Sequence, residues 1–215
     1  MNSKFMVENT KQVVISQIDT EEAHFFGFVK SNIDMTNTMR AIAKEWLDAL
    51  YQTWTHNYGK IIMEQDSEYR YQSLKVVKYL AFKYLLEKEI DPRKVKMSIT
   101  AVCAFPKKEK VLWLNTGSEM LYAYRGGKKL YRLCAQQKAL KRFRDQSIFN
   151  SNENYYSLSE GDIEDNARRI FVVSSEAIEL FEKSMQNATE ISQEQLKAFA
   201  QETKKPIIIG TVFNF

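Results

Sequence analysis

The stretch VLWLNTGSEMLYAYRGGKKLYRL, residues 111–133, decides the fold predicted for this chain. Its apolar residues come in short runs or alternate with polar ones, which is typical of β-strands. Gly126-Gly127 marks a hairpin turn inside the stretch, and Pro106-Lys107-Lys108 marks another turn just before it. With MSITAVCAF upstream, the pattern predicts an antiparallel meander of four strands, at residues 97–105, 110–117, 119–127 and 128–134.

Helices and further strands are expected on both sides of this meander. Upstream, the residue pattern predicts strands at 11–18 and 25–29, a helix from Thr36 or Asn37 to about residue 54, and a helix over 67–89. Downstream, it predicts a short helix at 137–143, a strand at 169–173, a helix from Ser174 to about Asn187, a helix from Ser192 and a strand at 207–213. This order places the chain in the α+β class.

Length and composition favour a single domain over residues 1–215, with residues 1–10 as a loose N-terminal arm. Hydrophobic residues make up 44% and aromatic residues 13% of the chain, which is ample for a core. No apolar run approaches the roughly 20 residues that span a bilayer, so membrane insertion is not expected. The first residues lack a signal-peptide pattern, which predicts a cytoplasmic protein. Cys103 and Cys134 are isolated and are expected to be buried free thiols.

Positive charge is concentrated in residues 93–144, which carry fourteen Lys and Arg against two Glu, while the whole chain has a net charge of +4. Such asymmetry predicts either an acidic or phosphorylated protein partner or, less favoured, a nucleic acid. The alternative is that these basic residues form an ordinary solvated surface that binds no partner. The candidate partner-binding residues are Lys128, Lys129, Arg132, Lys138, Lys141, Arg142 and Arg144.

Four passages of the sequence, taken in order, resemble the metal-dependent protein phosphatases of type 2C, the PPM family. They are FGFVKSNID (26–34), the stretch 111–133, RIFVVSSEAIELF (169–181) and TKKPIIIGTVF (203–213). In the second passage the matching residues are Asn115, Gly117, Tyr122, Tyr124, Arg125, Gly127, Lys129, Leu130 and Leu133. The resemblance implies a PPM-type α/β-β/α sandwich, in which two antiparallel sheets are flanked by helix pairs.

The acidic residues that hold two divalent metals in that family are replaced in this chain. Where the family has Asp-Gly after the FGV strand of its first passage, the chain has Lys30-Ser31, or Ser31-Asn32 with a shift of one residue. The other replaced positions are Ser175, Lys204-Lys205, Gly117-Ser118-Glu119-Met120 and Gln136-Gln137. Because Mg²⁺ and Mn²⁺ need carboxylate oxygens, the resemblance implies no metal cofactor. It implies a pseudophosphatase that acts as a regulatory or scaffolding protein-binding module.

An active, divergent Ser/Thr phosphatase is the main alternative, and it would need other carboxylates as Mn²⁺ or Mg²⁺ ligands. Glu21, Glu22, Asp34 and Glu176 are the candidates, because each lies near a lost ligand position. The ordinary interpretation is that they are turn, loop and first-turn residues. A third hypothesis is a nucleic-acid-binding accessory protein that uses the basic 93–144 segment. No catalytic His or Cys is predicted.

Overall fold

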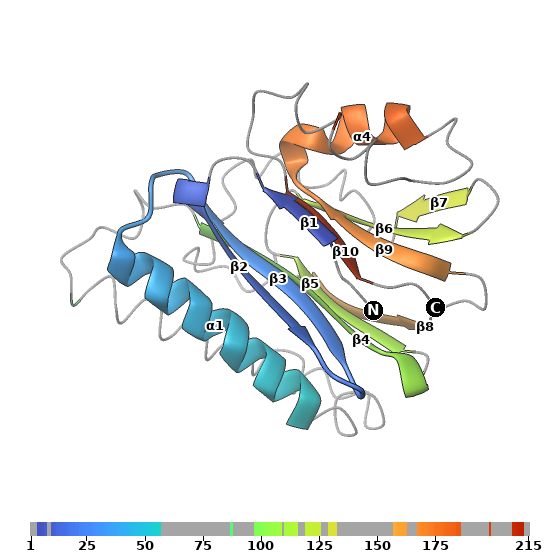
Figure 1. Ribbon diagram of the computed structural model, residues 1–215, viewed down its shortest axis with the longest axis horizontal. Coiled ribbons are helices and arrows are strands. Elements are labelled where there is room, and N and C mark those ends of the chain that lie inside the picture. Colours follow the sequence, from blue (N-terminus) through green and yellow to red (C-terminus); the bar gives the residue numbers. More distant parts are fainter. Residues whose placement is uncertain are drawn as a thin grey trace.

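Two five-stranded antiparallel sheets face each other in the structure (Figure 1). The structure is a computed structural model that describes residues 4–7, 10–56, 87, 97–108, 110–115, 119–125, 129–132, 157–162, 167–185, 198 and 208–212. Within these ranges, one helix lies on the outer face of each sheet, α1 against one and α4 against the other.

The first sheet, called the β3 sheet, has the strand order β2-β3-β4-β5-β8. Its strands are β2 (Val13–Asp19), β3 (His24–Ser31), β4 (Met97–Phe105), β5 (Lys110–Asn115) and β8 (Ser157–Asp162). The second, called the β6 sheet, has the order β1-β10-β9-β6-β7. Its strands are β1 (Lys4–Val7), β10 (Ile208–Val212), β9 (Ala167–Val173), β6 (Met120–Arg125) and β7 (Lys129–Arg132).

The four strands expected as one meander are all present, but the prediction of a single meander was wrong. β4 and β5 pair in the β3 sheet, and β6 and β7 pair in the β6 sheet. The chain therefore changes sheets between Asn115 and Glu119. An apolar pattern predicts that a segment forms a strand. The sheet that the strand joins depends on which strand, distant in the sequence, pairs with its edge. β6 pairs with β9, which follows it by more than forty residues in the chain.

The helix α1 (Asn37–His56) covers the outer face of the β3 sheet. Thr36 caps it as expected, because its Oγ1 accepts a hydrogen bond of 3.2 Å from the backbone N–H of Met39. Its buried residues recur at helical spacing and pack on the sheet as one apolar face. They are Met39, Ala43, Trp46, Leu47, Leu50 and Trp54.

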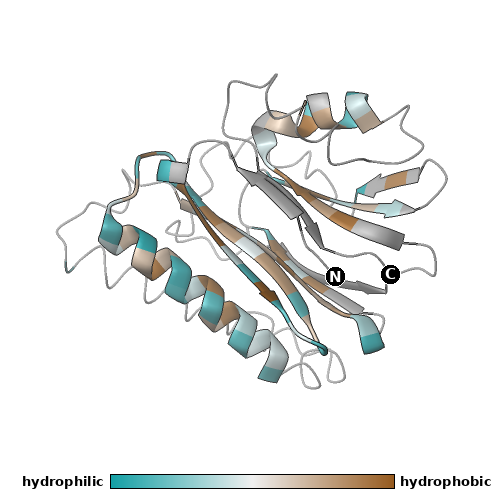
Figure 2. Cartoon of the chain, in the orientation of Figure 1, coloured by the Kyte–Doolittle hydropathy of each residue, from teal (hydrophilic) through white to brown (hydrophobic). Residues whose placement is uncertain are grey.

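Side chains of β3 alternate between two cores, as the period of a strand requires. Phe26 and Phe28 belong to the core between the sheets, whereas Phe25 and Val29 belong to the core under α1. Figure 2 shows the resulting hydrophobic strands in the middle of the sandwich and the hydrophilic outer face of α1. Since both faces of β3 are buried, its sequence is a continuous apolar run rather than an alternating one.

On the opposite side, α4 (Ile178–Met185) packs on the β6 sheet. Phe181 lies 5.3 Å from the ring of Tyr122 and 5.5 Å from that of Phe171, measured between centroids. The expected second helix of each helix layer, at 67–89 and from Ser192, lies outside the described residues except for the helical positions Glu87 and Ala198. The short helix expected at 137–143 also lies outside them.

Residues Lys4–Val7, which we expected in a loose arm, form β1 and pair with β10. β8 lies beyond the segments for which the sequence predicted a strand, and it pairs with β5 at the edge of the β3 sheet. No helix within the described ranges is long and apolar enough to cross a membrane.

Candidate functional site

The space between the two sheets is apolar in its middle and polar at one end. In β3, the side chains of Phe26 and Phe28 lie in the core between the sheets, so Lys30, two residues further, points the same way. In β6, Tyr122 contacts α4 through its hydroxyl group, so Leu121 faces the β3 sheet. Glu119, two residues before Leu121, then faces the β3 sheet as well.

Lys30 and Glu119 form an ion pair that connects the two sheets. The Lys30 Nζ lies 3.7 Å from Glu119 Oε1, and the side chains are 16% and 3% exposed, respectively. Lys30 is held between β2 and β4, where it pairs with Val13 and Ser98. The pair therefore connects the β3 sheet to the β6 sheet, and both side chains are largely shielded from solvent.

A second polar contact fixes the position of Glu119. Thr100 and Asn115 are opposite each other in β4 and β5, and Thr100 Oγ1 donates a hydrogen bond of 3.1 Å to Asn115 Oδ1. Asn115 Nδ2 donates a hydrogen bond of 2.6 Å to the backbone carbonyl of Glu119. The amide of Asn115 thus spans the connection between β5 and β6, and all three residues are buried.

Ser174 completes this polar end. Val173, the last residue of β9, pairs with Met120 in β6, so the next residues, Ser174 and Glu119, extend from the same end of the sheet. Ser174 is fully buried, and its carbonyl accepts a hydrogen bond from the backbone N–H of Ala177. We call Lys30, Thr100, Asn115, Glu119 and Ser174 the polar end of the sandwich.

Residues after β3 leave the sheet on the side of α1. The buried Ser31 Oγ accepts a hydrogen bond of 3.2 Å from the backbone N–H of Ile33. The backbone N–H of Met35 donates to the carbonyl of Lys11, which ties this loop to the start of β2. Asp34, a candidate metal ligand, is exposed in this loop.

The structure does not bring Glu21 and Glu22 together with Asp34. Both glutamates are exposed in the turn of the β2–β3 hairpin, which Thr20 closes by hydrogen bonds to Ala23. The hairpin turn and Lys30 lie at opposite ends of β3. At about 3.3 Å per residue, this separation is on the order of 20 Å. The two glutamates are therefore far from the polar end.

Glu176, the fourth candidate ligand, lies in the 3-10 turn Ser175–Ala177 that follows β9. Its backbone is thus adjacent to the polar end, and its side chain is not among those that the structure describes. Within the described residues, no group of three His, Cys, Asp or Glu side chains is arranged to hold a metal ion.

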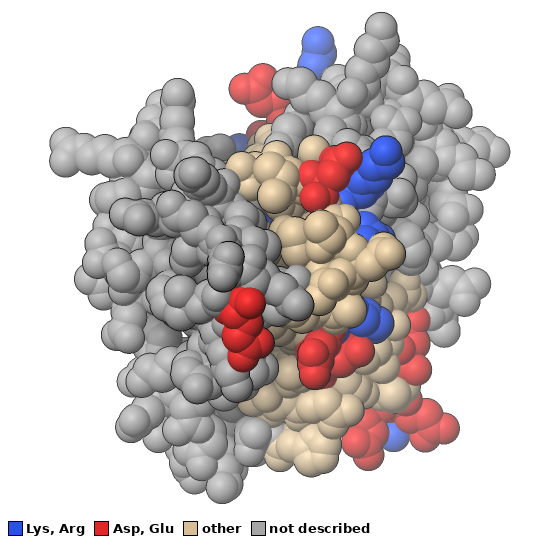
Figure 3. Space-filling view, turned by 90° about the vertical axis from the view of Figure 1, so that its left-hand side faces the viewer, with Lys and Arg blue, Asp and Glu red and all other residues tan. Residues whose placement is uncertain are grey.

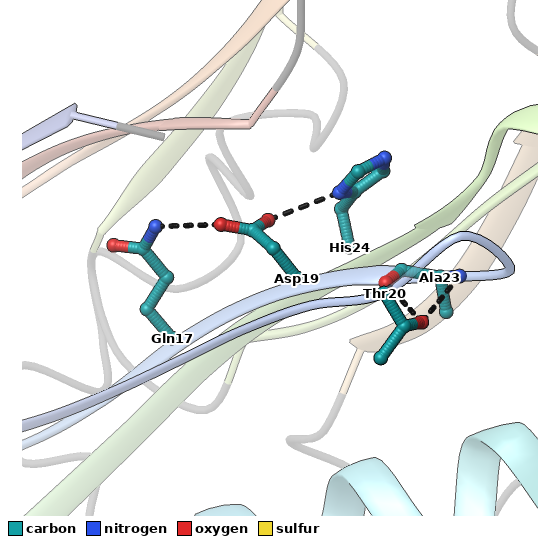
Figure 4. Close-up of polar contacts among 5 residues, drawn as sticks. All are labelled: Gln17, Asp19, Thr20, Ala23 and His24. Atoms are coloured by element: carbon teal, nitrogen blue, oxygen red, sulfur yellow. Dashed lines mark hydrogen bonds and ion pairs between the residues drawn. The ribbon is translucent and has the colours of Figure 1, made fainter. Parts of the chain in front are cut away.

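At the other end of the β3 sheet, sequence reasoning missed a polar group around Asp19. Figure 4 shows Gln17 and His24 on either side of the Asp19 carboxylate. Gln17 Nε2 donates to Asp19 Oδ2 at 2.9 Å, and His24 Nδ1 lies 3.0 Å from Asp19 Oδ1. Asp19 and His24 are opposite each other in the hairpin, so a correct prediction of the four-residue turn would have paired them. The group contains no nucleophile.

Arg132, a candidate partner-binding residue, is engaged within the protein. Its Nε and Nη2 donate hydrogen bonds of 2.8 Å to the two carboxylate oxygens of Glu182, and the Tyr122 hydroxyl donates to the same carboxylate at 2.6 Å. The hydrogen bond to Glu182 raises the pKa of Arg132. The three side chains attach α4 to β6 and β7, and the Arg132 side chain keeps 40% of its surface exposed.

The other candidate partner-binding residues are placed only in part. Lys129 belongs to β7, and its side chain is outside those described. Lys128, Lys138, Lys141, Arg142 and Arg144 lie outside the described residues, so their role stays a prediction. Figure 3 shows another side of the molecule, on which acidic and basic residues of the described part both occur.

Cys103 is a buried free thiol, as expected. It lies in the core under α1, and burial raises the pKa of its thiol. A thiol in this state is a poor nucleophile, because the thiolate is the reactive form.

No family model matches the sequence, and no curated protein matches it. Solved structures do match its fold. A serine/threonine phosphatase from S. agalactiae superposes with a TM-score of 0.70 at 9% identity, covering 100% of both chains. A PPM Ser-Thr phosphatase from Mycobacterium smegmatis, solved with cacodylate, gives 0.63 at 11% identity over 100% of this chain and 99% of that one. A C. elegans sex determining protein gives 0.71 at 8% identity over 99% of this chain and 64% of that one. The expected PPM-like fold is confirmed.

Proposed function

We propose that this chain is a catalytically inactive PPM-fold protein, a pseudophosphatase that acts as a regulatory or scaffolding protein-binding module. The observation that supports this function most directly is the Lys30–Glu119 ion pair. In the resemblance to the phosphatases, Lys30 takes the place of an aspartate that binds metal, or directly precedes that place if the alignment is shifted by one residue. Its ammonium group lies between the sheets, at the polar end, and contacts a carboxylate there.

The residues of the polar end do not suit a divalent metal ion. Mg²⁺ and Mn²⁺ bind most strongly where several carboxylates gather. Among the side chains that the structure describes there, the polar end offers one carboxylate, Glu119, which contacts Lys30 at 3.7 Å. A metal ion bound to Glu119 would face the Lys30 ammonium, and two like charges at such short range in a poorly solvated site repel strongly.

The end of β9 supports the same proposal. The phosphatase passage that resembles RIFVVSSEAIELF has an aspartate where this chain has Ser175, and the neighbouring Ser174 is fully buried. A serine hydroxyl is a neutral and weak ligand for a hard divalent ion. Without metals, water at this site lacks the activation that lowers its pKa towards 7.

A binding role for the inactive domain draws on the charge distribution of the chain. The basic 93–144 segment, with its net charge of +12, suits an acidic or phosphorylated protein partner. The residues proposed for the contact are Lys128, Lys129, Arg132, Lys138, Lys141, Arg142 and Arg144. Because Arg132 already holds Glu182, we expect the neighbouring lysines and arginines to contribute more than Arg132.

The first test is turnover of a phosphoserine peptide in 2 mM Mn²⁺, with an active PPM phosphatase as the positive control. We expect no release of phosphate above the rate without protein. Turnover that is lost in the Asp34→Asn variant, or in Glu21→Gln, would refute inactivity and support the active alternative. Asn and Gln keep the size of the side chain, so such a loss would report on the carboxylate charge.

The second test measures binding to immobilised acidic, phosphoserine and uncharged peptides. Charge reversal by Lys138→Glu with Lys141→Glu, or by Arg142→Glu with Arg144→Glu, should weaken binding to the acidic or phosphoserine peptide at least tenfold. The matched control is Lys11→Glu with Lys183→Glu, because these lysines are exposed elsewhere on the chain. Equal binding by all variants would contradict the proposed surface. A labelled single-stranded oligonucleotide tests the nucleic-acid alternative, for which a steep salt dependence is expected.

A further inference from the structure

The Lys30–Glu119 pair joins the end of β3 to the start of β6, two strands that are not consecutive in the chain. Lys30 is near the end of β3, and Glu119 directly precedes β6, so one side chain belongs to each sheet. The hydrogen bonds that hold a sheet together run within it. Among the described residues, the core between the sheets is mostly apolar, and two polar contacts cross it at this end, namely the Lys30–Glu119 pair and the hydrogen bond from Asn115 Nδ2 to the Glu119 carbonyl. The ion pair is therefore a polar link between the sheets, at the end of the sandwich where the resemblance places metal ions.

We infer that the Lys30 ammonium is the built-in cation of the polar end, and that it holds the two sheet ends together without a divalent metal. This inference rests on the proposed function, because it takes the site to lack metal ions in the working protein. Lys30 then has a structural role that the phosphatase resemblance alone does not assign.

Burial is the first reason for this role. The Glu119 side chain is 3% exposed, and an ionised carboxylate removed from water is strongly destabilising unless it is paired. Lys30 supplies the positive charge, and the side chains that the polar end contributes from β4, β5 and β9 are neutral, namely Thr100, Asn115 and Ser174.

Rigidity is the second reason. The hydrogen bond from Asn115 Nδ2 fixes the backbone of Glu119, and the β2 and β4 ladders fix the backbone of Lys30. Since both backbones are already ordered, forming the pair costs less conformational entropy than an ion pair between two mobile surface groups. The Lys44–Asp48 pair on α1 is such a surface pair, with side chains 48% and 45% exposed.

A double-mutant cycle on the full chain tests the link, with thermal unfolding as the measurement. Lys30→Met keeps an unbranched side chain and removes the charge, and we expect it to lower Tm by about 5–10 °C because it removes the Lys30 ammonium from a buried carboxylate. Glu119→Gln should lower Tm by less, because the Lys30 side chain can still reach water. The decrease in Tm of the double variant should be clearly smaller than the sum of the decreases in the two single variants.

The same cycle on Lys44→Met and Asp48→Asn is the comparison. These half-exposed side chains contact each other and Ser16, and we expect single changes of about 1–2 °C and a smaller coupling than in the Lys30–Glu119 cycle. Additive losses in the Lys30–Glu119 cycle would overturn the inference. If Lys30→Met does not fold, Lys30→Gln replaces it in the cycle, alone and in combination with Glu119→Gln.

Addition of metal separates this inference from the proposed function. With Lys30 as the built-in cation, the Tm of the wild-type chain should be the same in 2 mM Mn²⁺ and in EDTA. A rise of several degrees in Mn²⁺ would overturn the inference, because it would show metal bound to the folded state. Phosphopeptide turnover is read in the same samples. Turnover refutes inactivity, whereas an additive cycle without turnover refutes only the role of Lys30.

Discussion

Helix α1 packs closely on the β3 sheet at Gly27, and replacement of this glycine by alanine tests the packing. A Cβ atom at Gly27 would lie 2.9 Å from Leu47 Cδ2, 3.0 Å from Phe25 Cζ and 3.1 Å from Ala101 Cβ. The first two distances are at or below the shortest that carbon atoms tolerate, and the third is tight. All four residues are buried, so none can move into solvent to make room.

The size of the effect follows from two opposing contributions. Overpacking a core by one methyl group typically destabilises by about 1–3 kcal/mol. Replacing glycine by alanine also restricts the unfolded chain, which stabilises by about 0.4–1 kcal/mol. The Ala101 Cβ is fixed to the β4 backbone, so Leu47 or the whole of α1 must shift. We therefore expect a net loss of about 1–2 kcal/mol, or roughly 3–8 °C in Tm for a chain of this size.

Urea unfolding followed by circular dichroism measures this loss, and Leu47→Val is the variant that identifies its cause. Leu47→Val shortens the side chain that carries the 2.9 Å contact. Gly27→Ala should therefore cost less in the Leu47→Val background than in the wild type. If Gly27→Ala leaves the unfolding free energy unchanged or raises it, the close approach of α1 to β3 is refuted.

Three further predictions concern single side chains. Asn115→Ala should lower the unfolding free energy by about 1–3 kcal/mol in urea titrations, because it removes both buried hydrogen bonds of the amide; an unchanged value would contradict the contact with Glu119. Glu182→Gln should speed amide exchange in α4 relative to α1, with a loss of about 1 kcal/mol or less since Arg132 is partly exposed; equal exchange in both proteins would argue against this attachment. Cys103 should resist alkylation by iodoacetamide at pH 8 until the chain unfolds, because burial raises its pKa; labelling of the native protein, read by peptide mass spectrometry, would show that the strand opens.

Local sequence patterns predicted the secondary structure well where the pattern depends on one helix or strand alone. Thr36 or Asn37 was expected to cap a helix that ends near residue 54. Thr36 caps α1, and the helix ends at His56. The division of the meander between two sheets was not predicted. It depends on the pairing of Met120 with Val173 and of Leu114 with Leu158, and contacts across such distances leave no periodic signal in the sequence.

The contacts at the polar end could likewise not be predicted from local sequence patterns. Lys30 was identified at a position of lost charge, because the passage FGFVKSNID has a recognisable counterpart in the phosphatases. Its partner Glu119 was noted only as part of a degenerate signature. Nothing near either residue in the sequence links the two, and their contact follows from the packing of one sheet on the other. The Asp19–His24 contact was missed for a simpler reason, since it depends on the register of a hairpin turn.

The ion pair also favours the proposed inactive protein over an active phosphatase. An active phosphatase needs carboxylates grouped around a divalent ion, and Glu21 and Glu22 lie at the wrong end of β3 to join that group. Asp34 is exposed beyond β3, and the carboxylate that the structure describes at the polar end, Glu119, is in contact with a lysine. Metal binding there would require Lys30 to leave Glu119 and expose its ammonium group to the ion. A strong coupling between Lys30 and Glu119 would therefore support the proposed inactivity and would also count against the active alternative.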